Sequence, residues 1–81
     1  MKIPREVSGA DLISVLCAHF AYEQVHQVGS HIILQTEEPI HHRIVVPAHN
    51  PLRIGTLSSI LRAVAAAKRI DKKEILRHLR P

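Results

Sequence analysis

The spacing of hydrophobic residues changes twice along the chain, and each change marks a different kind of element. From Ser8 to about residue 20, apolar residues recur with helical spacing, which predicts a helix with one buried face. Ser8 followed by Asp11 resembles a capping box, which favours a helix start at Ser8. The apolar positions of this predicted helix are Leu12, Ile13, Leu16, Cys17 and Phe20.

Residues 22–46 lose the helical period and gain β-branched residues in three short runs. Gly29-Ser30 and the segment 37–39 separate these runs, so the pattern predicts an antiparallel three-stranded meander. If Val28 pairs with His31 and Thr36 with Ile40, side chains alternate between two faces. The predicted core face holds Val25, Ile32, Leu34, Ile40, Ile44 and Val46, with His42 near its edge. The predicted open face holds His26, Val28, His31, Ile33, Gln35, His41, Arg43 and Val45.

Helical spacing returns after a loop that contains Pro47 and Pro51. A second helix is predicted with Thr56 as its N-cap, and Asp71 with Glu74 makes a second capping box, which predicts the start of a short third helix. This order predicts an α+β fold, in which helices cover one face of a small antiparallel sheet. A chain of 81 residues is expected to form a single domain over residues 1–81. The predicted apolar stripes are Leu57, Ile60, Leu61, Val64 and Ala65, then Ile75, Leu76 and Leu79.

Composition narrows the classes of protein to consider. A single cysteine, Cys17, excludes an internal disulfide or a multi-cysteine zinc site, and its apolar neighbours predict a small buried residue. No apolar run reaches the ~20 residues that span a bilayer, and the N-terminal segment lacks the apolar core of a signal peptide. A cytoplasmic protein that does not enter a membrane is therefore expected. The formal net charge of +4 favours an anionic partner such as RNA, DNA or an acidic protein.

Seven histidines raise two chemical possibilities beyond simple solvation. His41, His42 and His49 lie within nine residues, but adjacent strand residues point to opposite faces, so no metal site is expected. General acid–base catalysis is the second possibility, because imidazole titrates near neutral pH. RNA carries its own nucleophile, the 2′-OH, so one positioned histidine with cationic help is enough for cleavage without metal. Ser30 adjoins His31, but neighbouring strand side chains diverge, which argues against a Ser–His hydrolase.

Basic residues are concentrated toward the C-terminal end of the chain, and two interpretations of them stay open. They form either a solvated helix face or a surface that contacts phosphates. The backbone N–H groups at the predicted start of the second helix, Gly55-Thr56, are also able to hold a phosphate. The basic residues are Arg62, Lys68, Arg69, Lys72, Lys73, Arg77 and Arg80.

Three stretches together resemble the HicA family of toxin ribonucleases. They are IPREVSGADLISVL, VGSHIIL and HHRIVVPAHNPLRIGTLSSIL, in this order and spacing, and the resemblance runs from about Pro4 to Leu79. It implies a fold similar to a double-stranded RNA-binding domain and a toxin that cleaves mRNA without a metal or other cofactor. The histidine of the GSH motif, His31 here, is implied as the catalytic acid or base. The implied partner is a HicB-type antitoxin.

The expected site has one catalytic residue and a set of RNA-binding residues. Gly29 and Ser30 are expected to shape the turn that presents His31. The other expected RNA-binding residues are His26, Arg43, Thr56 and Arg62.

The chain departs from the family pattern at two places. His26, Gln27 and Val28 stand where the family usually has a cationic stretch, and Ala21 stands where it usually has a glycine. The missing cations favour an alternative function, a non-catalytic RNA-binding or protein-interaction module on the same fold.

Overall fold

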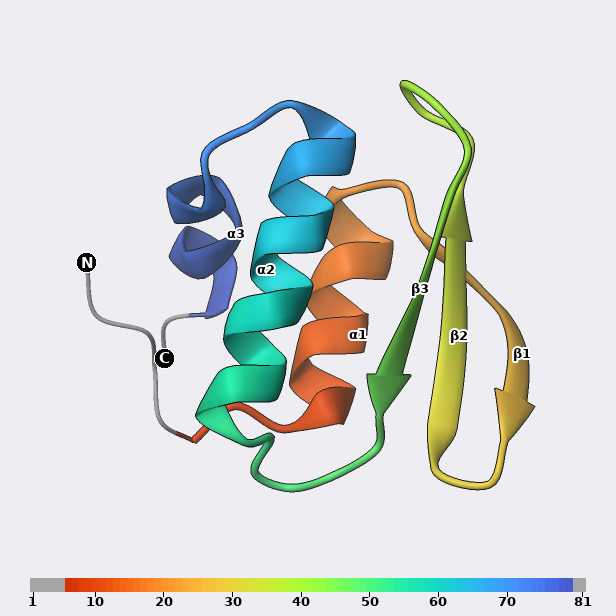
Figure 1. Cartoon of the computed structure of the whole chain (residues 1–81), viewed down its shortest axis with the longest axis vertical. Coiled ribbons are helices and arrows are strands. Elements are labelled where there is room, and N and C mark those ends of the chain that lie inside the picture. The colour runs from red at the N-terminus through yellow and green to blue at the C-terminus, as the bar shows by residue number, and fades with distance from the viewer. Residues whose placement is uncertain (1–5, 80–81) are drawn as a thin grey trace.

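The computed structural model describes residues 6–79 and shows a three-stranded sheet with helices on one side (Figure 1). The elements are α1 (Gly9–His19), β1 (Glu23–Val28), β2 (His31–Thr36), β3 (His42–Pro47), α2 (Ile54–Lys68) and α3 (Lys72–Leu79). The strands are antiparallel in the order β1-β2-β3, which confirms the predicted α+β fold class. Pro4 and Arg80, which entered the sequence interpretation, lie outside the described residues. Within residues 6–79, none of the helices has the length and apolarity needed to cross a membrane.

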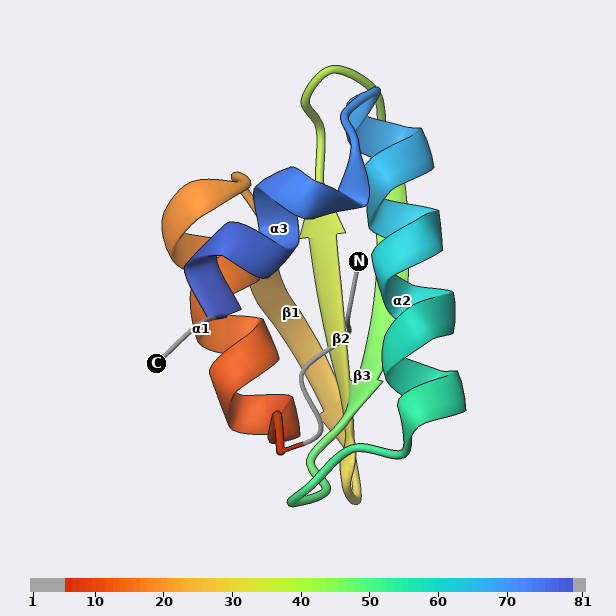
Figure 2. The ribbon, with the colours of Figure 1, turned by 90° about the vertical axis from the view of Figure 1, so that its left-hand side faces the viewer.

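The molecule has three layers: the sheet, the pair α1 and α2, and α3. Figure 1 shows α1 and α2 beside the sheet, and Figure 2 shows α3 crossing these two helices on the side away from the strands. Each layer contributes fully buried aliphatic side chains to one core, as the predicted helical stripes required. These side chains are Leu12 and Leu16 of α1, Leu34 and Val46 of the sheet, Leu57, Leu61 and Val64 of α2, and Ile75 of α3.

The start of α1 is fixed by a side-chain cap and by a close backbone approach. Ser8 Oγ accepts a hydrogen bond from the Asp11 N–H at 3.0 Å, and the Asp11 carboxylate accepts from the Ser8 N–H at 3.4 Å. This confirms the predicted capping box. A Cβ on Gly9 would lie 2.0 Å from the Pro47 carbonyl oxygen, so glycine lets α1 reach the end of β3. The Gly9 N–H donates to the His49 carbonyl at 2.8 Å.

The start of α2 differs from the predicted one, whereas α3 begins at the predicted place, directly after Asp71. Thr56 is not the N-cap of α2; the N-cap is Arg53, three residues earlier, and it makes no side-chain cap hydrogen bond. The buried Leu52 precedes this start, and its N–H donates to the Val7 carbonyl at 2.8 Å, so tertiary packing sets where the helix begins.

At α3, Asp71 Oδ1 accepts from the Lys73 N–H at 2.9 Å, which is a helix cap. Glu74 does not complete the predicted reciprocal bond, because its carboxylate accepts from Arg77 at 3.2 Å.

The predicted burial of Cys17 is wrong. The residue is exposed, because the buried face of α1 is centred on Leu12 and Leu16, and position 17 lies about 100° further around the helix. Partial desolvation of the sulfur raises the pKa of the thiol, which keeps it protonated at neutral pH.

Candidate functional site

The first hairpin has the predicted register and presents His31. Val28 lies opposite His31, and Gly29 has a φ of +58°, a left-handed conformation that glycine adopts without strain. The Gln27 side-chain amide donates to the Gly29 carbonyl at 3.0 Å and closes the turn. On the other side of His31 lies Pro47 of β3. His31 is exposed, so its predicted place on the open face is confirmed.

The second hairpin has a different register from the predicted one. Thr36 lies opposite His42 instead of Ile40, so the loop spans residues 37–41. A shift of two residues keeps every β3 side chain on its predicted face, because faces alternate with a period of two. It does remove Ile40 from the predicted core face, and this side chain is 54% exposed.

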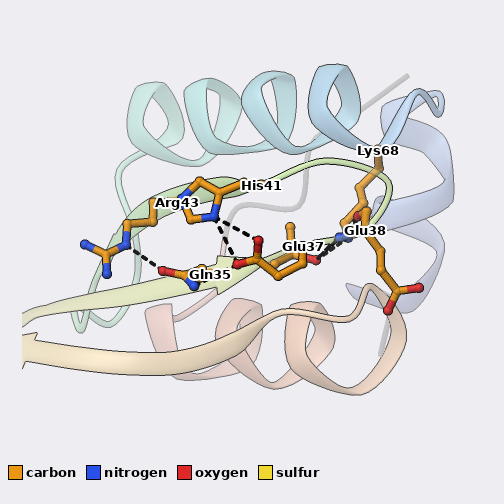
Figure 3. A network of polar contacts seen from close by, with 7 residues as sticks. Gln35, Glu37, Glu38, His41, Arg43 and Lys68 are labelled. Carbon is orange, nitrogen blue, oxygen red and sulfur yellow. Dashed lines mark hydrogen bonds and ion pairs between the residues drawn. The ribbon is translucent and has the colours of Figure 1, made fainter.

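Lys68, at the end of α2, holds this longer loop. Its Nζ donates to Thr36 Oγ1 at 2.8 Å and to the Glu38 carbonyl, and Figure 3 shows the lysine reaching toward Glu38. The Thr36 side chain is buried, and its hydroxyl also accepts from the Glu38 N–H at 3.3 Å. The turn signals in 37–39 located the turn, and a lysine from a distant helix holds the first part of the longer loop in place.

A β-bulge displaces one predicted core residue. The β1–β2 register shifts between Gln24 and His26, which leaves Val25 without an opposed partner and 40% exposed. Val25 was predicted on the core face, and this is wrong. Tyr22, just before β1, is 4% exposed and supplies buried surface at this edge instead.

The observed register fixes which residues surround His31 on the open face. The next pairs along the sheet are His26 with Ile33 and Ile33 with Val45, so His26 is a diagonal neighbour of His31. Arg43 lies opposite Gln35, four residues further along β2, which corresponds to about 13 Å of strand. The open-face assignment placed Arg43 near His31, and this expectation is wrong. Arg43 Nε donates to Gln35 Oε1 at 2.7 Å.

Two histidines of the sheet region, His41 and His42, contact polar side chains of the fold. His42 Nδ1 and the Tyr22 phenolic oxygen are 2.8 Å apart, and burial, aided by the Lys68 cation, lowers the pKa of His42. His41 Nδ1 lies 3.0 Å from Glu37, and this contact lowers the pKa of the Glu37 carboxyl. Within residues 6–79, no three His, Cys, Asp or Glu side chains form a group that could hold a metal ion.

The Gly29-Ser30 turn shares one end of the molecule with the segment 48–53 and the start of α2 (Figure 1). The Ala48 N–H donates to the Ser30 carbonyl at 2.6 Å, which ties this segment to the turn. His49 and Arg53 are exposed there, and sequence reasoning did not assign them to RNA.

Thr56 and Arg62 belong to the helix layer, not to the open face. Thr56 lies in the first turn of α2, which contains no acidic residue, so the positive end of the helix dipole is uncompensated. Arg62 is exposed near the middle of α2, away from His31. The structure therefore brings together His26, Gly29, Ser30 and His31, and leaves Arg43 and Arg62 apart from them.

The sequence of the chain matches a known protein family. The model of the family described as the HicA toxin of bacterial toxin-antitoxin systems matches residues 9–65, from the start of α1 into the last turn of α2. The chain belongs to the HicA toxin family. No curated protein and no solved structure matches the chain.

The HicA match covers the whole sheet and α1, while α3 lies beyond it. One departure from the HicA pattern now has a structural consequence. Ala21, where glycine is usual, has a φ of 60°, a conformation that costs a residue with a Cβ about 1–2 kcal/mol.

Proposed function

We propose that this HicA-family toxin is an endoribonuclease that cleaves mRNA without a metal ion, with His31 as general base or acid. The observation that carries this proposal is the position of His31, exposed at the first residue of β2 beside the Gly29-Ser30 turn. His41 and His42, in contrast, have fold partners in Glu37 and Tyr22.

The chemistry requires little more than a proton acceptor and positive charge. His31 accepts the proton of a ribose 2′-OH, and the 2′-oxygen attacks the adjacent phosphorus. The bond from phosphorus to the 5′-oxygen breaks, this oxygen takes a proton from water or an acid, and a 2′,3′-cyclic phosphate remains. A positioned histidine contributes about 10²–10⁴-fold to such a step.

The neighbours of His31 are assigned supporting roles. Gly29 and Ser30 form the turn that lets RNA approach, and His26, diagonal to His31, lies close enough to contact the same phosphate when protonated. The free N–H groups at the start of α2, around Thr56, hold another phosphate at the same end of the molecule. Arg43 contacts a flanking phosphate further along the open face.

The test is cleavage of labelled RNA by the purified chain, with and without EDTA, followed on a gel. We expect cleavage in EDTA by the wild type and a loss of about 10²–10⁴-fold in His31→Ala. His41→Ala is the matched control, because it removes an exposed histidine from the opposite end of the sheet. We expect His41→Ala to cleave like the wild type.

Two results would contradict the proposal. The first is undiminished cleavage by a His31→Ala protein whose circular dichroism spectrum matches that of the wild type. The second is a strict metal requirement. Should His31→Ala not fold, His31→Gln preserves the volume of the side chain and repeats the test.

A HicB-type antitoxin is the partner that we propose for the open face. Val28 and Val45 are 58% and 47% exposed there. Val28 lies on β1 and Val45 on β3, on either side of β2, the strand that carries His31. Exposed aliphatic side chains suit a protein partner, whose binding at this face would also cover His31. Co-purification with the antitoxin should be lost in Val45→Asp and retained in Ala66→Asp on the helix layer.

The same exposed valines favour the second candidate function, a non-catalytic RNA-binding or protein-interaction module. This candidate predicts RNA retention that weakens with salt, without any cleavage product. The gel with labelled RNA distinguishes it from the nuclease.

A further inference from the structure

Charge is separated along this chain and between its layers. Residues 53–79 contain seven Lys or Arg and two Asp or Glu, whereas residues 6–52 contain one Arg and five Asp or Glu. The first group lies in α2, α3 and the segments next to them, and the second includes the whole sheet. The cations of the described chain are therefore concentrated on the helix layers, away from the open face that carries His31.

Most of these cations lie on α2, on α3 and at the junction between the two helices, and they are called here the cationic surface. Arg69 is the C-cap of α2 and Lys72 begins α3, so the junction concentrates positive charge. Arg62 and Arg69 lie two helical turns apart, about 10.5 Å, and Lys73 and Arg77 one turn apart, about 6 Å. All its members except the half-buried Lys72 are exposed. The members are Arg62, Arg69, Lys72, Lys73 and Arg77.

The two acidic residues of this region already have partners within it. Asp71 Oδ1 accepts from the backbone N–H of Lys73, and the Glu74 carboxylate pairs with Arg77 at 3.2 Å. The acids therefore cap a helix and neutralise one arginine. The other cations of the surface remain a net source of positive potential.

We propose that the cationic surface binds the phosphate backbone of single-stranded RNA. Naming RNA as the ligand rests on the proposed function. The large hydrophobic side chains exposed in the described chain are Val25, Val28, Ile40, Val45 and Ile54, and none lies in residues 55–79. A protein-binding surface usually has an apolar or aromatic centre, whereas a phosphate backbone is bound by distributed cations without one. The surface chemistry therefore favours RNA over an acidic protein.

The cationic surface and the open face bind the same RNA strand. The molecule measures 30 × 29 × 20 Å, so a flexible single strand held on the helix layers can also reach the His31 side. Binding at one place raises the effective concentration of the strand at the other. The open face can then be poor in Lys and Arg and still receive RNA.

The experiment measures fluorescence anisotropy of a labelled, unstructured oligouridine at several salt concentrations. All variants carry His31→Ala, so that the RNA stays intact. The triple substitution Arg62→Gln, Arg69→Gln and Lys73→Gln should weaken binding at least about 10-fold near 0.1 M salt. The slope of log affinity against log salt should become shallower by about 2, because each contact with a single strand contributes about 0.7.

A matched control separates the surface from net charge. Ser14→Glu, on the exposed side of α1, lowers the net charge by one unit, as Arg69→Gln does. Arg69→Gln should weaken binding clearly more than Ser14→Glu. Equal weakening, or an unchanged salt slope in a triple variant that melts like its parent, would overturn the proposal. If the triple variant does not fold, the two single substitutions decide the question.

The same titration with labelled polyglutamate tests the acidic-protein alternative. Affinity equal to that for oligouridine, lost in the same triple variant, would overturn the assignment to RNA. Because this experiment measures binding without cleavage, it tests the cationic surface independently of the proposed nuclease activity. Absence of cleavage by the wild-type chain would contradict the proposed function and leave this binding result in place.

Discussion

The Tyr22 phenolic oxygen and His42 Nδ1 are 2.8 Å apart and join the segment after α1 to the first residue of β3. Lys68 Nζ lies 4.8 Å above the centre of the Tyr22 ring and completes a cluster from three parts of the chain. Desolvation raises the pKa of Tyr22 to about 12, so its hydroxyl stays protonated at neutral pH. The contact thus pairs a neutral phenol with an imidazole whose pKa is lowered.

The lowered pKa of His42 predicts a loss of stability in mild acid. In the unfolded chain His42 titrates near 6.5, and in the folded protein it titrates lower, because burial and the Lys68 and His41 charges oppose protonation. Above pH 6.5 both states are neutral and the stabilising contribution is complete. As the pH falls from 6.5 toward the folded pKa, the unfolded chain binds the proton first and stability decreases. Urea midpoints across this range measure the effect.

His42→Gln removes this titration and keeps a polar group beside Tyr22. Its stability should decrease less than that of the wild type between neutral and mildly acidic pH. His26→Gln, at an exposed position of β1, should keep the wild-type slope. Identical slopes in all three proteins would show that His42 does not carry this pH dependence.

Lys68→Met should destabilise the fold by about 1–2 kcal/mol. The variant keeps the aliphatic stem but removes the donor to Thr36 Oγ1 and the Glu38 carbonyl, and charged hydrogen bonds have energies of this order. Lys73→Met, at an exposed position of α3, should stay within about 0.5 kcal/mol of the wild type. Thermal unfolding followed by circular dichroism compares the two. Equal stability of both variants would mean that the lysine does not hold the 37–41 loop.

Gly9→Ala should destabilise the protein by about 1–3 kcal/mol, because the new methyl group would overlap the Pro47 carbonyl. Gly55→Ala is the opposite case. A Cβ at Gly55 meets nothing within 4 Å, and alanine favours the helix by about 0.5–1 kcal/mol. Urea denaturation should therefore rank Gly55→Ala above the wild type and Gly9→Ala below it. A stable Gly9→Ala would contradict the tight approach of α1 to β3.

Ala21→Gly should stabilise the protein by about 0.5–1 kcal/mol. Glycine relieves the left-handed backbone strain at φ 60°, and the gain is reduced by the greater freedom of glycine in the unfolded chain. Ala66→Gly, at an exposed position in α2, should instead destabilise by about 0.5–1 kcal/mol. Melting temperatures that move in the same direction for both variants would refute this explanation.

Local patterns predicted the features that depend on neighbouring residues. The Ser8–Asp11 cap, the apolar stripes of the helices and the Gly29-Ser30 turn all follow from residues within a few positions of one another. The place of His31 on the open face follows as well, because a tight turn sets the register and alternation then assigns each side chain. The resemblance to HicA depended on the same short stretches.

Tertiary contacts decided the rest. Lys68 of α2 holds the start of the second loop through Thr36, a residue far from it in sequence, and the observed β2–β3 register places Arg43 opposite Gln35. The bulge at Val25 and the buried Leu52 before α2 likewise depend on packing between layers. A local pattern predicts which side chains alternate between the two faces of the sheet and where turns occur. The length of the second loop, the start of α2 and the arrangement of charge between the layers depend on contacts between segments that are distant in sequence. Only the folded chain therefore determines them.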